Sequence, residues 1–242
     1  MHAAGVGCAD CHDSHSGQLQ RADDALCTEC HGQNAPLNVT HTKHSDAVAC
    51  VDCHMPERTY MERHPRRDHG FLIPDPILGK RTGSPDACTS CHEDAPRQDI
   101  ESAWTRWYGT QHEARRQLPL ALHAARGSET EAPQLLLAYL SGEPAPVHHA
   151  TAALALAPWA DQPEVAAALS HAADNDDALI RLGAVQALAS GVTNGLFPGA
   201  RLEPFLSDPS RAVRVAAGKG LETVLPPSAP ALRDYLTYLE AN

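Results

Sequence analysis

Every cysteine of the 242-residue chain belongs to one repeated pattern, Cys-x-x-Cys-His, which occurs four times between residues 8 and 92. Two thiols three residues apart on a helical turn can form thioether bonds with the two vinyl groups of a haem, and the next histidine can ligate the iron from the proximal side. The cysteines are Cys8, Cys11, Cys27, Cys30, Cys50, Cys53, Cys88 and Cys91, and the histidines after them are His12, His31, His54 and His92. The pattern therefore predicts four covalently attached c-type haems.

Other kinds of site also use closely spaced cysteines. Two Cys-x-x-Cys pairs can build a four-thiolate zinc site, and a single pair can act as a redox-active dithiol, but neither requires a histidine after the second cysteine. With 15 histidines in the chain, chance would place one there in all four pairs with a probability of roughly 10⁻⁵. Four tight pairs would also make poor disulfide staples, because each closes almost no loop. The spacing favours haem attachment.

Further histidines, which lie outside the motifs in the same part of the chain, could ligate iron from the distal side: His2, His15, His41, His44, His64 and His69. His15 is too close to His12 to face the same iron, so we expect it to reach a neighbouring haem. His41 and His44 are three residues apart and are expected to share a helix face, with at least one of them a ligand. His69 is the fourth choice, and His2 and His64 are reserves. These histidines predict mostly bis-histidine haems.

Two methionines and several basic residues accompany these histidines. Met55 and Met61 could bind iron, but packing is the expected role of a methionine beside so many histidines. The basic residues between the third and fourth motifs either face solvent or pair with haem propionates, and both roles stay open. They are Arg58, Arg63, Arg66, Arg67, Lys80 and Arg81.

The chain changes character near Gly109, which predicts two domains, 1–109 and 110–242. The first contains all eight cysteines and few long apolar stretches. Four haems on so short a segment leave little chain for a conventional core, so the macrocycles would supply the apolar mass and their attachment the staples. We expect a mainly α fold: a compact tetrahaem domain of short helices and loops, followed by a helical repeat domain.

The second domain repeats itself with a period of about 33 residues, which is typical of paired helices. Similar segments begin at Val147, Ile180 and Val213, and Arg181 and Arg214 fall in register. Helix-start signals precede the last two segments, and shorter helices are expected at roughly 163–173 and 200–207. This pattern predicts an α-solenoid of HEAT-like repeats, in which residues 112–140 could form a degenerate earlier unit. The alternative is an irregular helical bundle.

Composition limits the partners and the location. The formal net charge is −11 and 43% of the residues are apolar, which fits a globular protein and argues against nucleic acid and anionic lipid as partners. A basic surface on a partner protein is the complement we expect. No apolar run is long enough to span a membrane. Because c-type haem is normally attached after export, we expect a periplasmic or extracellular protein whose export signal lies outside this sequence, which is either a mature form or part of a longer chain.

The surroundings of the motifs resemble a family of bacterial multihaem c-type cytochromes with doubled CxxCH motifs and a tail of HEAT or tetratricopeptide repeats. The resemblance covers about residues 1–109, and the tail in architecture only. It rests on Gly5-Val-Gly-Cys-Ala-Asp-Cys-His-Asp-Ser-His-Ser-Gly, Leu26-Cys-Thr-Glu-Cys-His, Cys50-Val-Asp-Cys-His-Met-Pro, Thr59-Tyr-Met, Arg66-Arg-Asp-His-Gly-Phe-Leu-Ile-Pro and Pro85-Asp-Ala-Cys-Thr-Ser-Cys-His. Relatives usually carry further motifs upstream, in a part related to cytochromes of nitrogen-oxide metabolism. The resemblance therefore implies a fragment or a shortened relative, with four haems as a lower limit.

Irons with both axial positions filled leave no place for a substrate, so the leading hypothesis is electron transfer between redox partner proteins, other cytochromes among them, with no catalytic residues. The helical repeats would then serve as a docking surface, and the chain could self-assemble through either the haem domain or the helical tail. An extended haem chain in a filament is a variant of this hypothesis. The alternative is an enzyme, a nitrogen-oxide-type reductase module in which one haem keeps an open site beside acid–base groups. A repeat scaffold with haems as mere staples ranks last, because stability would not need four.

Overall fold

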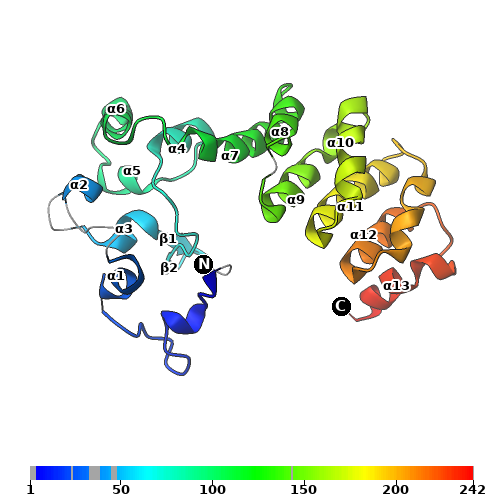
Figure 1. Ribbon diagram of the computed structural model, residues 1–242, viewed down its shortest axis with the longest axis horizontal. Coiled ribbons are helices and arrows are strands. Elements are labelled where there is room, and N and C mark those ends of the chain that lie inside the picture. Colours follow the sequence, from blue (N-terminus) through cyan, green and yellow to red (C-terminus); the bar gives the residue numbers. More distant parts are fainter. Residues whose placement is uncertain (1–3, 23, 33–38, 45–47, 143, 242) are drawn as a thin grey trace. The chain divides into compact units, whose positions relative to one another are not determined.

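The computed structural model of the protein describes residues 4–22, 24–32, 39–44, 48–142 and 144–241 (Figure 1). Most of these residues are helical, so the expected mainly α fold is confirmed. The chain divides into two compact units, Met1–Gln111 and His112–Asn242. The division follows Gly109, whose positive φ of 61° ends the last helix of the first unit.

The first unit is built from short helices and one β-hairpin. Its helices are α1 (Ala25–His31), α2 (Val39–Thr42), α3 (Cys50–His54), α4 (Pro76–Thr82), α5 (Ala87–Cys91) and α6 (Arg97–Tyr108), preceded by a 3₁₀ turn at Cys8–Asp10. The antiparallel hairpin pairs β1 (Glu57–Tyr60) with β2 (His64–Arg67). Loops were expected there. Met61 and Glu62 make the turn with positive φ in place of the usual Gly or Asn, so the sequence carries no hairpin signal.

The first unit has almost no apolar core. Among its described residues the only large hydrophobic side chain that is buried is Trp104, which is 4% exposed and donates from Nε1 to the carbonyl of Pro74 at 3.0 Å. Phe71, Leu72 and Ile73 remain 37–42% exposed. A folded unit of this size normally buries much more apolar surface. The described part of the first unit therefore buries little apolar surface of its own.

The second unit has a conventional core. Its helices are α7 (Glu113–Arg126), α8 (Ala132–Leu140), α9 (Pro146–Ala155), α10 (Pro163–Ala173), α11 (Ala178–Thr193), α12 (Arg211–Leu221) and α13 (Arg233–Glu240). One continuous apolar cluster, from Leu118 to Leu232 in the sequence, lies between them. The expected helix at 200–207 consists instead of two 3₁₀ turns, Gly199–Arg201 and Glu203–Ser207, where Pro204 lacks the N–H that an α-helix needs beyond its first turn.

Successive long helices of the second unit approach each other closely at glycines. A Cβ atom at Gly183 of α11 would lie 2.8 Å from the Cα atom of Ala150 in α9, and one at Gly220 of α12 would lie 2.9 Å from the Cα atom of Ala189 in α11. Both distances are too short for any real side chain. The two glycines therefore let α9, α11 and α12 pack backbone against backbone.

Arg181 and Arg214, the two arginines in register, make equivalent contacts. The guanidinium of Arg181 donates to the carbonyls of Asn175 and Asp176, just before its own helix, and binds both carboxylate oxygens of Asp208 at 2.8 and 2.9 Å. Arg214 likewise donates to the carbonyls of Asp208 and Pro209 and bonds to the carboxylate of Asp234. Each arginine thus ties the start of its helix to the segment that follows.

No helix among the described residues combines the length with the apolar character that crossing a membrane would take.

Candidate functional site

Each Cys-x-x-Cys-His motif lies on a single helical turn. In the first and fourth motifs the histidine N–H donates to the carbonyl of the first cysteine, with N–O distances of 2.9 Å for His12 and Cys8 and 3.0 Å for His92 and Cys88. The second and third motifs lie within α1 and α3. The turn brings two thiols and an imidazole together locally, which is the arrangement needed to attach one haem edge and ligate its iron.

The variable residue before the second cysteine has a structural role in two motifs. Asp10 accepts a hydrogen bond from the Gly7 N–H at 2.7 Å, and Asp52 accepts one from the Ala49 N–H at 3.0 Å. These carboxylates close the first turn of the motif from within, as the third residue of a capping box does. Sequence reasoning missed them, although an acidic residue three positions after a helix start was the available signal.

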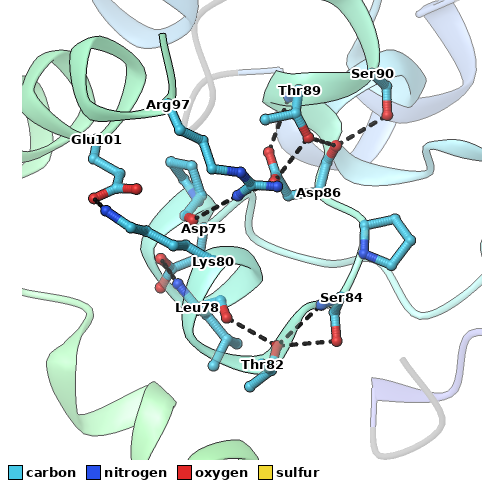
Figure 2. Close-up of polar contacts among 12 residues, drawn as sticks. Asp75, Leu78, Lys80, Thr82, Ser84, Asp86, Thr89, Ser90, Arg97 and Glu101 are labelled. Atoms are coloured by element: carbon cyan, nitrogen blue, oxygen red, sulfur yellow. Dashed lines mark hydrogen bonds and ion pairs between the residues drawn. The ribbon is translucent and has the colours of Figure 1, made fainter. Parts of the chain in front are cut away.

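The fourth motif is held by a buried carboxylate in front of it (Figure 2). Asp86, whose side chain is 4% exposed, accepts hydrogen bonds from the N–H and the hydroxyl of Thr89 at 3.0 and 2.9 Å and pairs with Arg97 at 3.2 Å. Ser90, inside the motif, donates its hydroxyl to the Asp86 carbonyl. The start of α5 is therefore fixed to α6 through one side chain.

Asp86→Ala should lower the free energy of unfolding by about 1–2 kcal/mol, because it removes the N-cap of α5 and leaves Arg97 without its carboxylate. Urea unfolding of the purified protein would measure this loss. Asp75→Ala is the matched control, since Asp75 caps α4, a helix without a motif. It should cost a similar free energy. With haem attached to the fourth motif, as the sequence predicts, Asp75→Ala should leave the absorption spectrum of that haem unchanged, whereas Asp86→Ala should disturb it. Equal spectra for the two variants would argue against a positioning role.

Three of the four proximal histidines face a second histidine. The ring centres of His12 and His69 are 6.2 Å apart, those of His54 and His41 6.1 Å, and those of His92 and His44 5.9 Å. The ring planes are inclined by only 19–37°. Each pair joins one motif to a histidine outside the motifs.

The spacing of these pairs fits an iron between them. Metal–imidazole bonds are about 2 Å long, and the ring centre lies about 1 Å behind the bonding nitrogen, so two axial imidazoles on one metal have their centres about 6 Å apart. The observed distances of 5.9–6.2 Å agree with that span. The three pairs therefore have the spacing that two imidazoles on one metal would adopt.

Hydrogen bonds orient several of these imidazoles. The Nδ1 atoms of His12, His54 and His69 lie 2.8–3.0 Å from the backbone carbonyls of Gly17, Leu72 and Arg67. The Nδ1 atom of His44 lies 2.6 Å from the carbonyl of Thr42. A carbonyl can only accept, so Nδ1 must carry the proton and Nε2 keeps its lone pair for a metal.

His41 and His44 do not share a helix face, in contrast to the expectation from their spacing. Helix α2 ends at Thr42, and Lys43 has a positive φ of 59°. The chain therefore turns before His44, and the two imidazoles face different motifs. Both become candidate ligands where the spacing alone required only one.

The remaining histidines have other surroundings. His15 is exposed, and its N–H donates to Asp13 at 3.1 Å. Neither His15 nor the proximal His31 faces another ring among the described residues. His64 is exposed at the start of β2, and His2 lies outside the described residues.

The cysteines place the motifs next to each other in sequence order. Cys27 of the second motif lies close enough to Cys11 of the first for an electrostatic interaction. Its thiol also forms a hydrogen bond with the thiol of Cys50 in the third motif. Cys53 interacts with Cys88 and Cys91 of the fourth motif. Neighbouring motifs in the sequence are therefore neighbours in space.

Asp24 connects the second and third motifs and was not predicted. It precedes α1, and its carboxylate accepts a hydrogen bond from the Cys50 N–H at the start of α3, at 2.8 Å. Burial raises the pKa of the Cys50 thiol to about 12, and the Asp24 carboxylate adds to the rise. Burial and the Asp86 carboxylate raise the pKa of Cys88 to about 12 in the same way. Both thiols are therefore neutral at neutral pH.

Half of the six basic residues considered for propionates have carboxylate partners within the protein. Arg58 pairs with Asp68 at 3.3 Å, Arg67 with Asp52 at 3.1 Å and Lys80 with Glu101 at 3.0 Å, the last pair visible in Figure 2. Arg66 lies over the ring of Tyr60. Arg63 and Arg81 are exposed. A packing role was expected for Met61, but its side chain is 76% exposed at the hairpin turn.

The described residues do not gather into a metal site made of side chains alone. Within the described residues no three His, Cys, Asp or Glu side chains form a group that could hold a metal ion, as a zinc site would require. All eight cysteines are unbridged. Pairs of imidazoles facing each other across a gap suit a metal whose other ligands come from a macrocycle.

Comparisons with protein-family models, curated proteins and solved structures give no match to this chain. A proposal for its function therefore depends on the chemistry and spacing of its own residues.

Proposed function

We propose that residues 1–109 hold four covalently attached haem c groups and that the protein transfers electrons between redox partner proteins. The observation that carries this proposal is the set of three facing imidazole pairs, with ring centres 5.9–6.2 Å apart. Haem c, when bound, supplies a one-electron redox centre at its iron. The cysteines of this chain would attach it, and the facing histidines would hold its iron and keep other ligands away.

The proposed axial ligands follow from the pairs. His12 and His69 serve the first motif, His54 and His41 the third, and His92 and His44 the fourth. His15, the expected ligand that faces no described ring, is assigned by elimination to the second motif, where it would pair with His31. The sequence order of neighbouring motifs in space supports transfer from one centre to the next.

The sparse core of the first unit supports the same proposal. Phe71, Leu72 and Ile73 are exposed. The ring of Phe71 nevertheless lies edge-on to that of His69, with ring centres 6.3 Å apart, and the Leu72 carbonyl accepts a hydrogen bond from His54. This apolar segment therefore runs between two of the imidazole pairs. Macrocycles bound at those pairs would cover it and provide the missing apolar mass.

For the second unit we propose an α-solenoid that docks a partner protein or another copy of the chain. The support is the recurrence of the arginine contacts at Arg181 and Arg214 and of the glycine contacts at Gly183 and Gly220. The family proposed for the whole chain is that of bacterial multihaem c-type cytochromes. Its location would be periplasmic or extracellular, and its partners other redox proteins.

One observation favours the reductase alternative. His31 faces no other imidazole among the described residues, so the iron of the second motif could keep an open distal position. An open iron beside acid–base groups could bind a nitrogen-oxide substrate.

Haem content and carbon monoxide binding of the exported, purified protein test both functions. Under our proposal the pyridine haemochrome spectrum shows a c-type α band with four haems per chain, and the reduced protein binds carbon monoxide only slowly, because a distal histidine must first leave the iron. Rapid binding of one equivalent would favour the reductase, and His15→Ala would then leave that stoichiometry unchanged. A protein without a c-type α band would contradict both.

A further inference from the structure

His41 and His44 belong to one short segment, 41–44, yet they face the proximal histidines of two different motifs. His41 lies opposite His54 of the third motif and His44 opposite His92 of the fourth, at 6.1 and 5.9 Å between ring centres. The two motif helices, α3 and α5, also contact each other. One short backbone segment therefore supplies the second histidine of two adjacent sites.

The conformation of the segment separates the two imidazoles. Lys43 has a φ of 59°, in the left-handed region that a lysine rarely adopts. Thr42 holds the turn, because its hydroxyl accepts from the His44 N–H at 3.2 Å and its carbonyl binds His44 Nδ1 at 2.6 Å. His44 is thereby fixed to the residue that follows His41, so the two cannot move independently.

A tyrosine from the last helix of the unit holds this segment in place. The Tyr108 hydroxyl donates to the His41 carbonyl at 2.9 Å. Its ring packs beside Trp104 with ring centres 5.5 Å apart, and Trp104 is the buried anchor of the unit. Tyr108 also lies near Cys53 and Cys88, one cysteine from each of the two motifs. The hydroxyl thus stands at the junction of both sites.

We propose that segment 41–44 is a shared distal arm, which ligates the third and fourth irons together and is latched by Tyr108 as a positioning residue. This proposal rests on the proposed function. A shared arm would make the two sites open and close together. Moving the arm far enough to free one distal position pulls the other imidazole with it, since Thr42 and the left-handed Lys43 join them rigidly. The latch stabilises only the closed arrangement.

Tyr108→Phe in the holoprotein tests the latch, with carbon monoxide as the probe of the reduced protein. Loss of one hydrogen bond should raise the rate of carbon monoxide binding about fivefold, with an amplitude of two haems and a single rate constant. Tyr60→Phe is the control, because Tyr60 is 58% exposed on the hairpin, and it should leave the rate unchanged. An unchanged rate in Tyr108→Phe, or a change at one haem alone, would overturn the proposal.

Lys43 provides a second pair of variants that does not depend on Tyr108. Lys43→Pro cannot adopt the left-handed conformation, because the proline ring restricts φ to negative values, and it should open two haems at once, seen as two high-spin signals in electron paramagnetic resonance. Lys43→Gly accepts the left-handed conformation and should keep both irons low-spin. If Lys43→Pro opens only one haem, the two ligands are independent and the shared arm is wrong. A wild-type protein with fewer than four haems would instead contradict the proposed function itself.

Discussion

Under the proposed function, His69→Ala should leave one of the four haems without its distal ligand and able to bind one equivalent of carbon monoxide rapidly when reduced. His69 faces His12 at 6.2 Å, and its Nδ1 atom is held by the Arg67 carbonyl. Alanine removes the only atom that can bond to iron from this position, so the iron becomes five-coordinate and high-spin. Titration with carbon monoxide and electron paramagnetic resonance would count the affected haem.

Two further variants serve as a control and as a rescue for His69→Ala. His64→Ala is the matched control, since His64 lies nearby in the sequence on the exposed end of β2 and should leave all irons low-spin. His69→Met should restore six-coordination and raise the reduction potential of that haem, because a thioether favours the reduced iron. A fully low-spin His69→Ala protein would remove His69 from the set of ligands.

Asp208→Ala should lower the free energy of unfolding of the second unit by about 3 kcal/mol. The side chains of Arg181 and Asp208 are only 14% and 6% exposed, and the carboxylate holds the guanidinium through two hydrogen bonds. Removing the carboxylate leaves a largely buried cation without its counter-charge. Urea unfolding followed by far-ultraviolet circular dichroism would measure the loss.

The equivalent pair in the next repeat offers a control. Asp234, which pairs with Arg214, is 39% exposed, so Asp234→Ala should cost clearly less because water can solvate the arginine that remains. Equal losses at the two positions would mean that burial does not set the strength of these contacts.

The Arg181–Asp208 pair should also make stability depend on pH. The hydrogen bonds from Arg181 lower the pKa of Asp208 below its ordinary value of 3.8. The folded state therefore binds this proton less readily than the unfolded state, and the contribution is fully present above pH 3.8 and lost as the pH falls through the folded pKa. Asp208→Asn should abolish this part of the acid dependence.

The sequence by itself determined the parts of the candidate site that are local. Cysteines three residues apart and the histidine after them lie on one helical turn whatever the rest of the chain does, so the cysteines and proximal histidines could be named directly. The mainly helical character and the regular repeat of the second domain were also readable, because helical periodicity is expressed within a short window.

The pairing of histidines was decided only by the tertiary structure. All imidazoles are chemically alike, and the sequence favoured His15 most although it faces no described ring. His69 reaches back past two motifs to His12, and a left-handed Lys43 sends His41 and His44 to different motifs. Spacing along the chain carries no information on such contacts, since they depend on how loops return.

The residues that position the site were likewise invisible in the sequence. Asp24, Asp86 and Tyr108 act on groups that are distant in sequence or on backbone atoms that any residue would supply. An aspartate that binds a backbone N–H looks like any solvated aspartate until the fold brings the two together. Local spacing therefore determined which atoms could attach haem, and packing decided which imidazoles face each other.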